Sequence, residues 1–142
     1  DMVFIHQPDP NKNPVNLVAS DLSEVTTSSR SFVLAKTLPP APAAGYIEDT
    51  TSAVTVSFEI RSGSTSQDYM SEVAIRVGDE LRGGPFLGTS TSFIEKSVDV
   101  AVQPGEVITI WLRSGQTTTW GTVRNVKIYS MRRIVLVPGA AW

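Results

Sequence analysis

The feature that most constrains the fold is a two-residue alternation of apolar and polar side chains. In AVTVSFEIR (residues 53–61), every second residue from Val54 to Ile60 is apolar, and the residues between them are polar or charged. Since successive side chains of a β-strand point to opposite faces, this pattern predicts a half-buried antiparallel strand. The chain repeats it too often for a helical domain.

Two further segments show the same alternation. YMSEVAIRV (69–77) is expected to turn its apolar residues inward (Tyr69, Val73, Ile75 and Val77) and its charged residues outward (Glu72 and Arg76). FIEKSVDVAV (93–102) places Ile94, Val98, Val100 and Val102 on one face, opposite Glu95, Ser97 and Asp99. Both segments are therefore predicted to form strands with one buried face.

Turn residues separate these strands from others. QPGE (103–106) has Pro-Gly at its centre, as type II turns prefer, and leads directly into VITIWLR (107–113). GDELRGG (78–84) is expected to form a hairpin turn with a short following strand, because it lacks the lysine and the helix of a phosphate-binding loop. With TVRNVKIYS, MRRIVLV and the weaker segments MVFI, VNLVA and SFVLAK, the count is about eight or nine strands. The exception is SDLSEVTTSS (20–29), whose serines and Glu24 suit one capped helical turn.

These observations predict an all-β chain folded as a jelly-roll-like antiparallel β-sandwich with extended terminal arms. An immunoglobulin-like sandwich is the alternative, although its cysteine pair is missing because the chain has no cysteine. The 142 residues suit a single domain, 1–142. Proline-rich residues 1–14 are expected to form an N-terminal arm, and residues 138–142 a C-terminal tail ending in Trp142.

The sequence offers little for catalysis. His6 is the single histidine, so no serine or cysteine nucleophile has an evident base. Adjacent acids occur at Glu48-Asp49 and Asp79-Glu80, and Glu59 and Glu72 are expected on outward strand faces, but nothing marks a buried proton donor for a glycosidase. We expect no enzyme activity and no cofactor.

Metal and membrane binding find equally little support. Oxygen ligands for calcium could come only from loop acids such as Asp49, Asp79 and Glu80, without EF-hand spacing, so no metal site is expected. No apolar run approaches the roughly 20 residues of a spanning helix, so no membrane partner is expected.

Charge is unevenly distributed along the chain. All 14 acidic residues lie at or before Glu106, whereas 5 of the 12 basic residues (Arg113, Arg124, Lys127, Arg132 and Arg133) lie after residue 110. Such polarity favours contact with a like subunit or an acidic protein partner. Because the basic residues are interleaved with strand residues instead of clustered, nucleic acid is not the expected partner.

Two tryptophans raise the question of a binding surface. Trp111 shares a predicted strand face with Thr109 and Arg113, while Ile110 and its apolar neighbours supply the buried side. Trp120 follows on what is expected to be the adjoining strand. Either the indoles pack within the protein or at a protein interface, which we favour, or they stack on the apolar face of a sugar. The predicted interface residues are Trp111, Arg113, Trp120, Arg132, Arg133 and Trp142.

The run SVDVAVQPGEVITIWLRSGQTTTWGTVRNVKIYSM (97–131) resembles the C-terminal half of β-sandwich domains in tailed-phage virion proteins, which include tail-fibre modules and capsid decoration (cement) proteins. The resemblance implies a structural protein on the capsid surface of a bacteriophage virion. Such a protein would bridge major capsid subunits through its body and arms, and is expected to be a homodimer. The alternative is a glycan- or receptor-binding β-sandwich module of a tail fibre or a carbohydrate-binding protein.

Overall fold

A computed structural model describes residues 3–6, 16–39, 52–103, 105–130 and 134–136. These residues form eleven strands and no helix: β1 (Val3–His6), β2 (Asn16–Asp21), β3 (Val25–Thr27), β4 (Val33–Thr37), β5 (Ser52–Ser62), β6 (Glu72–Val77), β7 (Glu80–Leu87), β8 (Ile94–Val102), β9 (Ile108–Arg113), β10 (Gly121–Ser130) and β11 (Ile134–Leu136). In the part of the chain described, no helix could cross a membrane.

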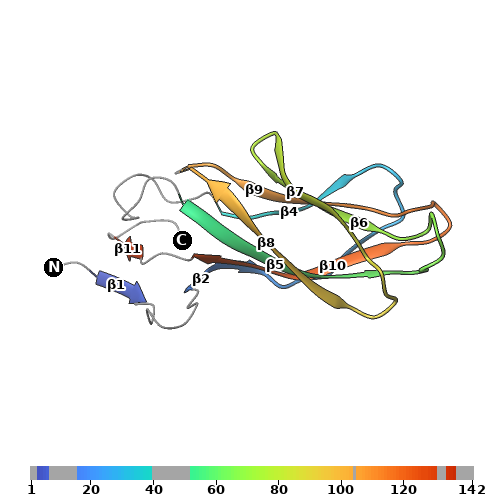
Figure 1. Ribbon diagram of the computed structural model, residues 1–142, viewed down its shortest axis with the longest axis horizontal. Helices are drawn as coiled ribbons and strands as arrows, with labels where there is room; N and C mark the ends of the chain where they lie inside the picture. The colour runs from blue at the N-terminus through green and yellow to red at the C-terminus, as the bar shows by residue number, and fades with distance from the viewer. Residues whose placement is uncertain (1–2, 7–15, 40–51, 104, 131–133, 137–142) are drawn as a thin grey trace.

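Two antiparallel sheets make up the body of the protein (Figure 1). One, here the B sheet, has the order β2-β10-β5-β8, with β3 also paired to β10; the other, the C sheet, has the order β4-β9-β6-β7. From β3 to β6 and again from β7 to β10, consecutive strands alternate between the two sheets. This arrangement confirms the jelly-roll-like antiparallel β-sandwich. A separate pair, β1 with β11, lies at the end of the body away from the loops that follow β5 and β9.

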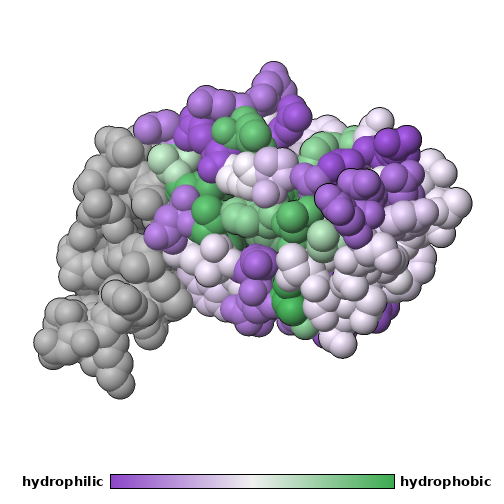
Figure 2. Space-filling model, turned by 45° about the vertical axis from the view of Figure 1, so that its right-hand side comes forward, coloured by the Kyte–Doolittle hydropathy of each residue, from purple (hydrophilic) through white to green (hydrophobic). Residues whose placement is uncertain are grey.

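The core lies between the two sheets and is made by the apolar positions of the alternating segments. Phe58 is fully buried and its ring meets that of Phe86 at 5.7 Å between centroids. The other buried residues of the core include Val54, Val56, Ile60, Val73, Ile75, Val77, Val100, Val102, Ile108, Ile110, Leu112, Val123, Val126 and Ile128. The predicted inward faces of residues 54–60 and 73–77 are thus confirmed. The face predicted for residues 94–102 is also confirmed, with Val100 and Val102 buried and Ile94 and Val98 partly buried against the core. On the side seen in Figure 2, hydrophobic side chains also reach the surface in a band between two hydrophilic regions.

A bulge in β10 explains why its buried residues change parity. Val123 and Val126 both face the core although they are an odd number of positions apart, because the pairing of β10 with β5 shifts between Arg124 and Lys127. Asn125 has φ of 52°, the left-handed region that asparagine tolerates better than most residues. The bulge therefore keeps both halves of β10 packed on one core.

One charged side chain is buried between the sheets at the edge where β4 faces β2 and β3. The Lys36 side chain is 1 % exposed, and its Nζ donates to Asp21 Oδ1 at 2.7 Å, and to the carbonyl and hydroxyl oxygens of Ser23, both at 2.6 Å. All three ammonium protons are thereby satisfied. This contact ties the two sheets together at an open edge of the sandwich.

Three expectations from the sequence were wrong. Residues 20–29 form the end of β2 and the strand β3, not a helical turn, because Val25 and its neighbours pair with β10. Tyr69 is 37 % exposed and precedes β6 instead of facing the core. The strand count was also low, since several short strands carry too few residues to show a period. The arms assigned to residues 1–14 and 138–142 lie largely or wholly outside the described residues.

Candidate functional site

Four loops meet at one end of the sandwich, at the right of Figure 1: 28–32, 63–71, 88–93 and 114–120. Backbone hydrogen bonds join them in pairs, including Ser62 N to Ser90 O, Gly63 N to Trp120 O and Ser114 N to Ser29 O. Their sequences are dominated by serine, threonine, glycine and glutamine. The loop end therefore presents many hydroxyl and amide groups on a rigid support, as binding sites on β-sandwiches often do.

Next to these loops, the outer face of the C sheet is organised in cross-strand rows. The row nearest the loops runs from Leu87 on β7 through Glu72 on β6 to Arg113 on β9. The guanidinium of Arg113 forms an ion pair with the Glu72 carboxylate and lies 5.6 Å from the centre of the Phe32 ring. Both charged partners are less than a third exposed, so this ion pair is partly shielded from water.

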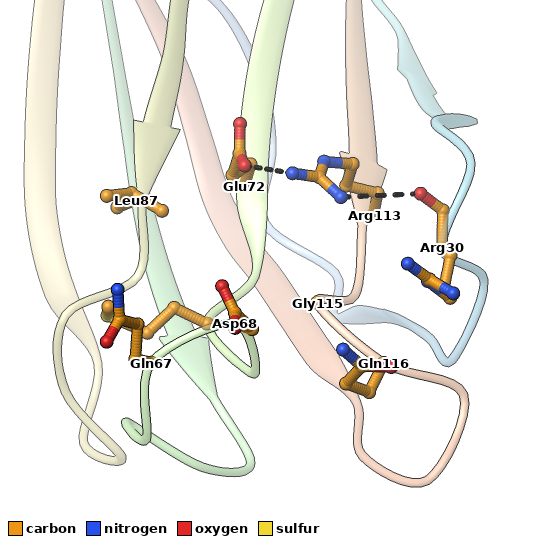
Figure 3. Close-up of a pocket in the computed structure, with 9 residues that line it drawn as sticks. Arg30, Gln67, Asp68, Glu72, Leu87, Arg113, Gly115 and Gln116 are labelled. Carbon is orange, nitrogen blue, oxygen red and sulfur yellow. Dashed lines mark hydrogen bonds and ion pairs between the residues drawn. The ribbon is translucent and has the colours of Figure 1, made fainter.

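A cavity of about 590 Å³ opens at this end of the C sheet. Two arginines, two acids, two amides and two apolar side chains line it, together with one glycine: Arg30, Arg113, Asp68, Glu72, Gln67, Gln116, Met70, Leu87 and Gly115. Figure 3 shows the Glu72–Arg113 pair above Asp68 and Gln116, with Arg30 beside Arg113 and Gln67 on the side of Asp68. The volume lies within the roughly 300–1,000 Å³ of small-molecule pockets.

Glycine at position 115 allows two of the lining loops to approach each other. A Cβ atom at Gly115 would lie 2.4 Å from the carbonyl carbon of Tyr69 and 2.5 Å from the carbonyl oxygen of Asp68. No side chain fits there without moving the backbone of one loop. The close approach places Gln116 and Asp68 on the same cavity.

Trp111 lies in the second row of the same outer face, between Leu34 on β4 and Ala74 on β6. Its indole Nε1 donates to Thr109 Oγ1 at 2.9 Å, and the Arg76 guanidinium lies 5.2 Å from its ring centre. Trp111 is half-buried. It is thus held in place by a hydrogen bond and a cation–π contact, one row away from the cavity.

The structure separates the two tryptophans that the sequence analysis put on adjoining strands. β9 belongs to the C sheet and β10 to the B sheet, so residues 114–120 cross between sheets instead of forming a hairpin. Trp120 is 37 % exposed and lies near Arg61 on the B sheet, at 5.2 Å from ring centre to guanidinium carbon. Trp111 and Arg113 thus share one surface, and Trp120 belongs to another.

The other predicted interface residues, Arg132, Arg133 and Trp142, lie outside the described residues. The charge asymmetry that suggested them is partly neutralised within the fold. Arg113 pairs with Glu72, and Arg124 pairs with both Glu24 and Glu59. Basic residues of the C-terminal segment therefore meet acidic residues of the N-terminal segment inside one chain.

Among the described residues, no group of three or more acidic or histidine side chains could hold a metal ion. Of the loop acids considered for calcium, Asp79 and Glu80 lie at the β6–β7 hairpin, where Glu80 pairs with Arg82, and Asp49 lies outside the described residues. Two acids of the B sheet, Asp21 on the edge strand β2 and Glu59 on β5, have pKa values lower than usual for their side chains. Lys36 and then Ser23 lower the pKa of Asp21, and hydrogen bonds from Asn125 and Arg124 lower that of Glu59.

Of the residues predicted from the sequence, Arg113 lines the cavity and Trp111 lies one row away; the other lining residues were not predicted. Arg30, Gln67, Asp68 and Gln116 lie in loops with no periodic pattern, and Glu72 was expected only to face outward. The one available signal was compositional, because four segments rich in serine, threonine and glycine follow every second strand, from β3 to β9.

Neither a protein-family model nor a curated protein sequence matches this chain. Solved structures do resemble it. The C-terminal domain of EclA, a sugar-binding protein, superposes with a TM-score of 0.54 at 11 % identity, covering 87 % of this chain and 89 % of that domain. The CBM22-1 xylan-binding domain of Paenibacillus barcinonensis Xyn10C gives a TM-score of 0.48 at 7 % identity, covering 85 % of this chain and 98 % of that one.

A third similar structure is the CBM36-1 domain of a multidomain xylanase from the hindgut metagenome of Trinervitermes trinervoides. Its TM-score is 0.43 at 13 % identity, with 97 % of this chain and 92 % of that chain covered. At such identities the similarity to the EclA domain shows a shared β-sandwich fold.

Proposed function

We propose that this protein is a carbohydrate-binding β-sandwich module, which holds a saccharide in the cavity at the loop end of the C sheet and does not cleave it. The observation that carries the proposal is the composition of the cavity wall. Planar side chains that form two hydrogen bonds at once, such as Arg113, Asp68 and Gln116, stand beside the apolar Leu87 and Met70.

A sugar ring needs this combination of groups. Adjacent hydroxyls of a sugar act as donor and acceptor together, and carboxylate, amide and guanidinium groups match such pairs with two parallel hydrogen bonds. The C–H face of the ring is apolar and gains from contact with hydrophobic side chains. The Glu72–Arg113 ion pair fixes both polar groups before a ligand arrives, which reduces the entropy lost on binding.

Trp111 extends the site along the outer face of the C sheet. It is two residues before Arg113 on β9, a distance of about 7 Å along a strand. A second sugar unit bound beyond the cavity would therefore meet the indole. The EclA domain, which has the same fold, belongs to a sugar-binding protein and supports the proposal as an analogy, because one fold hosts many functions.

The test is a binding screen against immobilised neutral and acidic oligosaccharides, followed by calorimetry on those that bind. Gln116→Ala and Asp68→Asn are expected to weaken binding about tenfold each, the cost of roughly one strong hydrogen bond. Asparagine is chosen at position 68 because the φ there is 70°, which alanine resists. Thr117→Ala is the matched control, since Thr117 is exposed on the same loop and does not line the cavity. Equal affinities of the Gln116 and Thr117 variants, or no saturable binding at all, would refute the proposal.

Catalysis is tested on the same ligand. Incubation with the protein is expected to leave the oligosaccharide intact by chromatography, because Glu72 is tied to Arg113 in an ion pair instead of standing free to transfer a proton. Cleavage that disappears in Glu72→Gln would make the protein an enzyme.

The role as a capsid cement protein, with a major capsid protein as partner, a homodimeric state and a virion location, remains an untested prediction. The partial pairing of Arg113 and Arg124 within the chain removes some of the charge that an acidic partner would need. A glycan-binding protein whose Trp111→Ala variant loses the sugar but keeps its native mass would favour the carbohydrate-binding role. Loss of association with capsids in that variant, without any glycan ligand, would favour the other.

A further inference from the structure

We infer a second ligand site on the outer face of the B sheet, where Arg61, flanked by Trp120 and Phe93, binds the carboxylate of an acidic sugar residue. The inference rests on the proposed carbohydrate-binding function and names an additional substrate class for it. It uses the sheet opposite the cavity, so the two sites have separate residues and separate readouts.

Three residues distant in sequence build this site. Arg61 lies near the end of β5; its guanidinium carbon is 4.5 Å from the centre of the Phe93 ring and 5.2 Å from that of Trp120. The register that pairs Ile60 with Ile94 brings Phe93 beside Arg61, and the hydrogen bond from Gly63 N to Trp120 O brings the indole to the other side. The guanidinium is thereby held between two aromatic groups.

The charge of Arg61 is uncompensated. Within the described residues, Arg82, Arg113 and Arg124 each pair with a carboxylate, whereas Arg61, like Arg76 on the other sheet, forms no ion pair and no side-chain hydrogen bond. Its Nε is buried without a hydrogen-bond partner, as are those of Arg76 and Arg82, so an unsatisfied donor adds to the uncompensated charge.

The nearest acid on the same strand face cannot serve Arg61, because other groups already occupy it. Arg124 donates to Glu59 Oε1 at 3.0 Å and the Asn125 amide donates to Oε2 at 2.6 Å. Arg124 also pairs with Glu24, and its guanidinium lies 3.6 Å from the centre of Phe93. Arg124 and Glu59 thus satisfy each other, whereas Arg61, which also contacts Phe93, is left without an anion.

The geometry favours a carboxylate attached to a sugar ring. A guanidinium fork matches a planar carboxylate with two parallel hydrogen bonds, and its flanking rings exclude water that would weaken them. Trp120 is 37 % exposed and offers a flat surface on which the ring of the same sugar can lie.

The test compares a trimer of galacturonic acid with its methyl ester, which has the same rings without the charge. Titrations followed by NMR of the indole N–H signals, assigned with Trp111→Phe and Trp120→Phe variants, locate the binding. The acid is expected to shift the Trp120 signal and to bind at least about tenfold tighter than the ester.

Three variants make the test specific. Arg61→Gln is expected to weaken binding of the acid about tenfold or more, and Arg61→Lys to restore only part of it, because lysine keeps the charge and loses the fork. Arg82→Gln is the matched control, with the same change in charge on the other sheet. Thermal unfolding of each variant checks that Phe93 and its neighbours remain packed.

The outcomes separate this inference from the proposed function. Equal binding of acid and ester, equal affinity of the Arg61→Gln and Arg82→Gln variants, or shifts confined to Trp111 would overturn the second site. If neutral oligosaccharides still bind through Gln116 in that case, the proposed function stands. Absence of saturable binding for every saccharide would remove both.

Discussion

The buried ammonium of Lys36 gives the sharpest test of how this sandwich is held together. Removing its anionic partner and removing the ammonium itself should have unequal costs. Asp21→Asn keeps the shape and one acceptor but leaves a positive charge on a side chain that is 1 % exposed. Lys36→Met removes that charge and keeps most of the apolar volume, while the Asp21 side chain, 41 % exposed, can be hydrated.

The magnitudes follow from burial. Breaking a buried ion pair by removal of one partner costs about 3–5 kcal/mol, and the partial exposure of Asp21 places Asp21→Asn near the lower end, at about 3 kcal/mol. Lys36→Met is expected to cost about 1 kcal/mol or less, because buried pairs replaced by well-packed apolar groups are often neutral. In the Lys36→Met background, Asp21→Asn should then cost almost nothing.

The assay is urea unfolding of the parent protein, both single variants and the double variant, which gives a double-mutant cycle. A coupling free energy of about 2–3 kcal/mol is expected between the two positions. If Asp21→Asn costs no more than Lys36→Met, or if the two effects simply add, the buried ammonium does not depend on Asp21 and the reasoning fails.

The same pair predicts an acid dependence. The hydrogen bond from Lys36, with those from Ser23, lowers the folded-state pKa of Asp21 below its ordinary value of 3.8. The unfolded state therefore takes up a proton first as pH falls, so the contribution is fully present above about pH 3.8 and is lost below it. Stability of the Lys36→Met variant should fall less steeply in this range.

Two further predictions concern backbone positions. Gly121→Ala should destabilise the protein by about 2–3 kcal/mol in urea unfolding, because the added Cβ would lie 2.3 Å from that of Ser71; a loss under 0.5 kcal/mol would mean that β10 and the loop that ends at Ser71 can separate there. Asn125→Gly should cost about 1 kcal/mol, mainly the hydrogen bond to Glu59, whereas Asn125→Ala should cost about 1 kcal/mol more because alanine resists a φ of 52°. Equal stabilities of these two variants in thermal unfolding would show that the bulge rearranges.

The alternation of side chains predicted the buried faces of the central strands because burial and period are linked directly in a sheet. As expected, every second residue from Val54 to Ile60 and from Val73 to Val77 faces the core. The method failed at Tyr69, where the alternation continued by chance into a turn. In β10, for which no buried face was predicted, the Asn125 bulge changes the parity of the buried residues. A bulge leaves no mark on a hydrophobic pattern except the change of phase that it causes.

Pairing between strands could not be read from the sequence, and the placement of the tryptophans shows why. SGQTTT (114–119) has the composition of a hairpin turn, yet it connects β9 to β10 in the other sheet. The composition of a loop indicates that the chain turns. Which strand it pairs with after the turn depends on the competition among all strands for partners. Trp111 and Trp120 were therefore assigned to one surface when they belong to two.

The candidate sites depend on that same competition. Arg61, Phe93 and Trp120 each look unremarkable in sequence: an outward arginine, a residue before a strand and an aromatic after a polar loop. They come together because β8 and β10 flank β5 on either side, with Ile94 opposite Ile60 and Gly121 opposite Ser62. Because of that order, Arg61 has the aromatic neighbours Phe93 and Trp120, while Glu59 on the same strand forms its ion pair with Arg124. An arginine left without an anion is thus a property of the strand order, and the carboxylate that we expect it to bind can be tested without knowing how the rest of the surface is used.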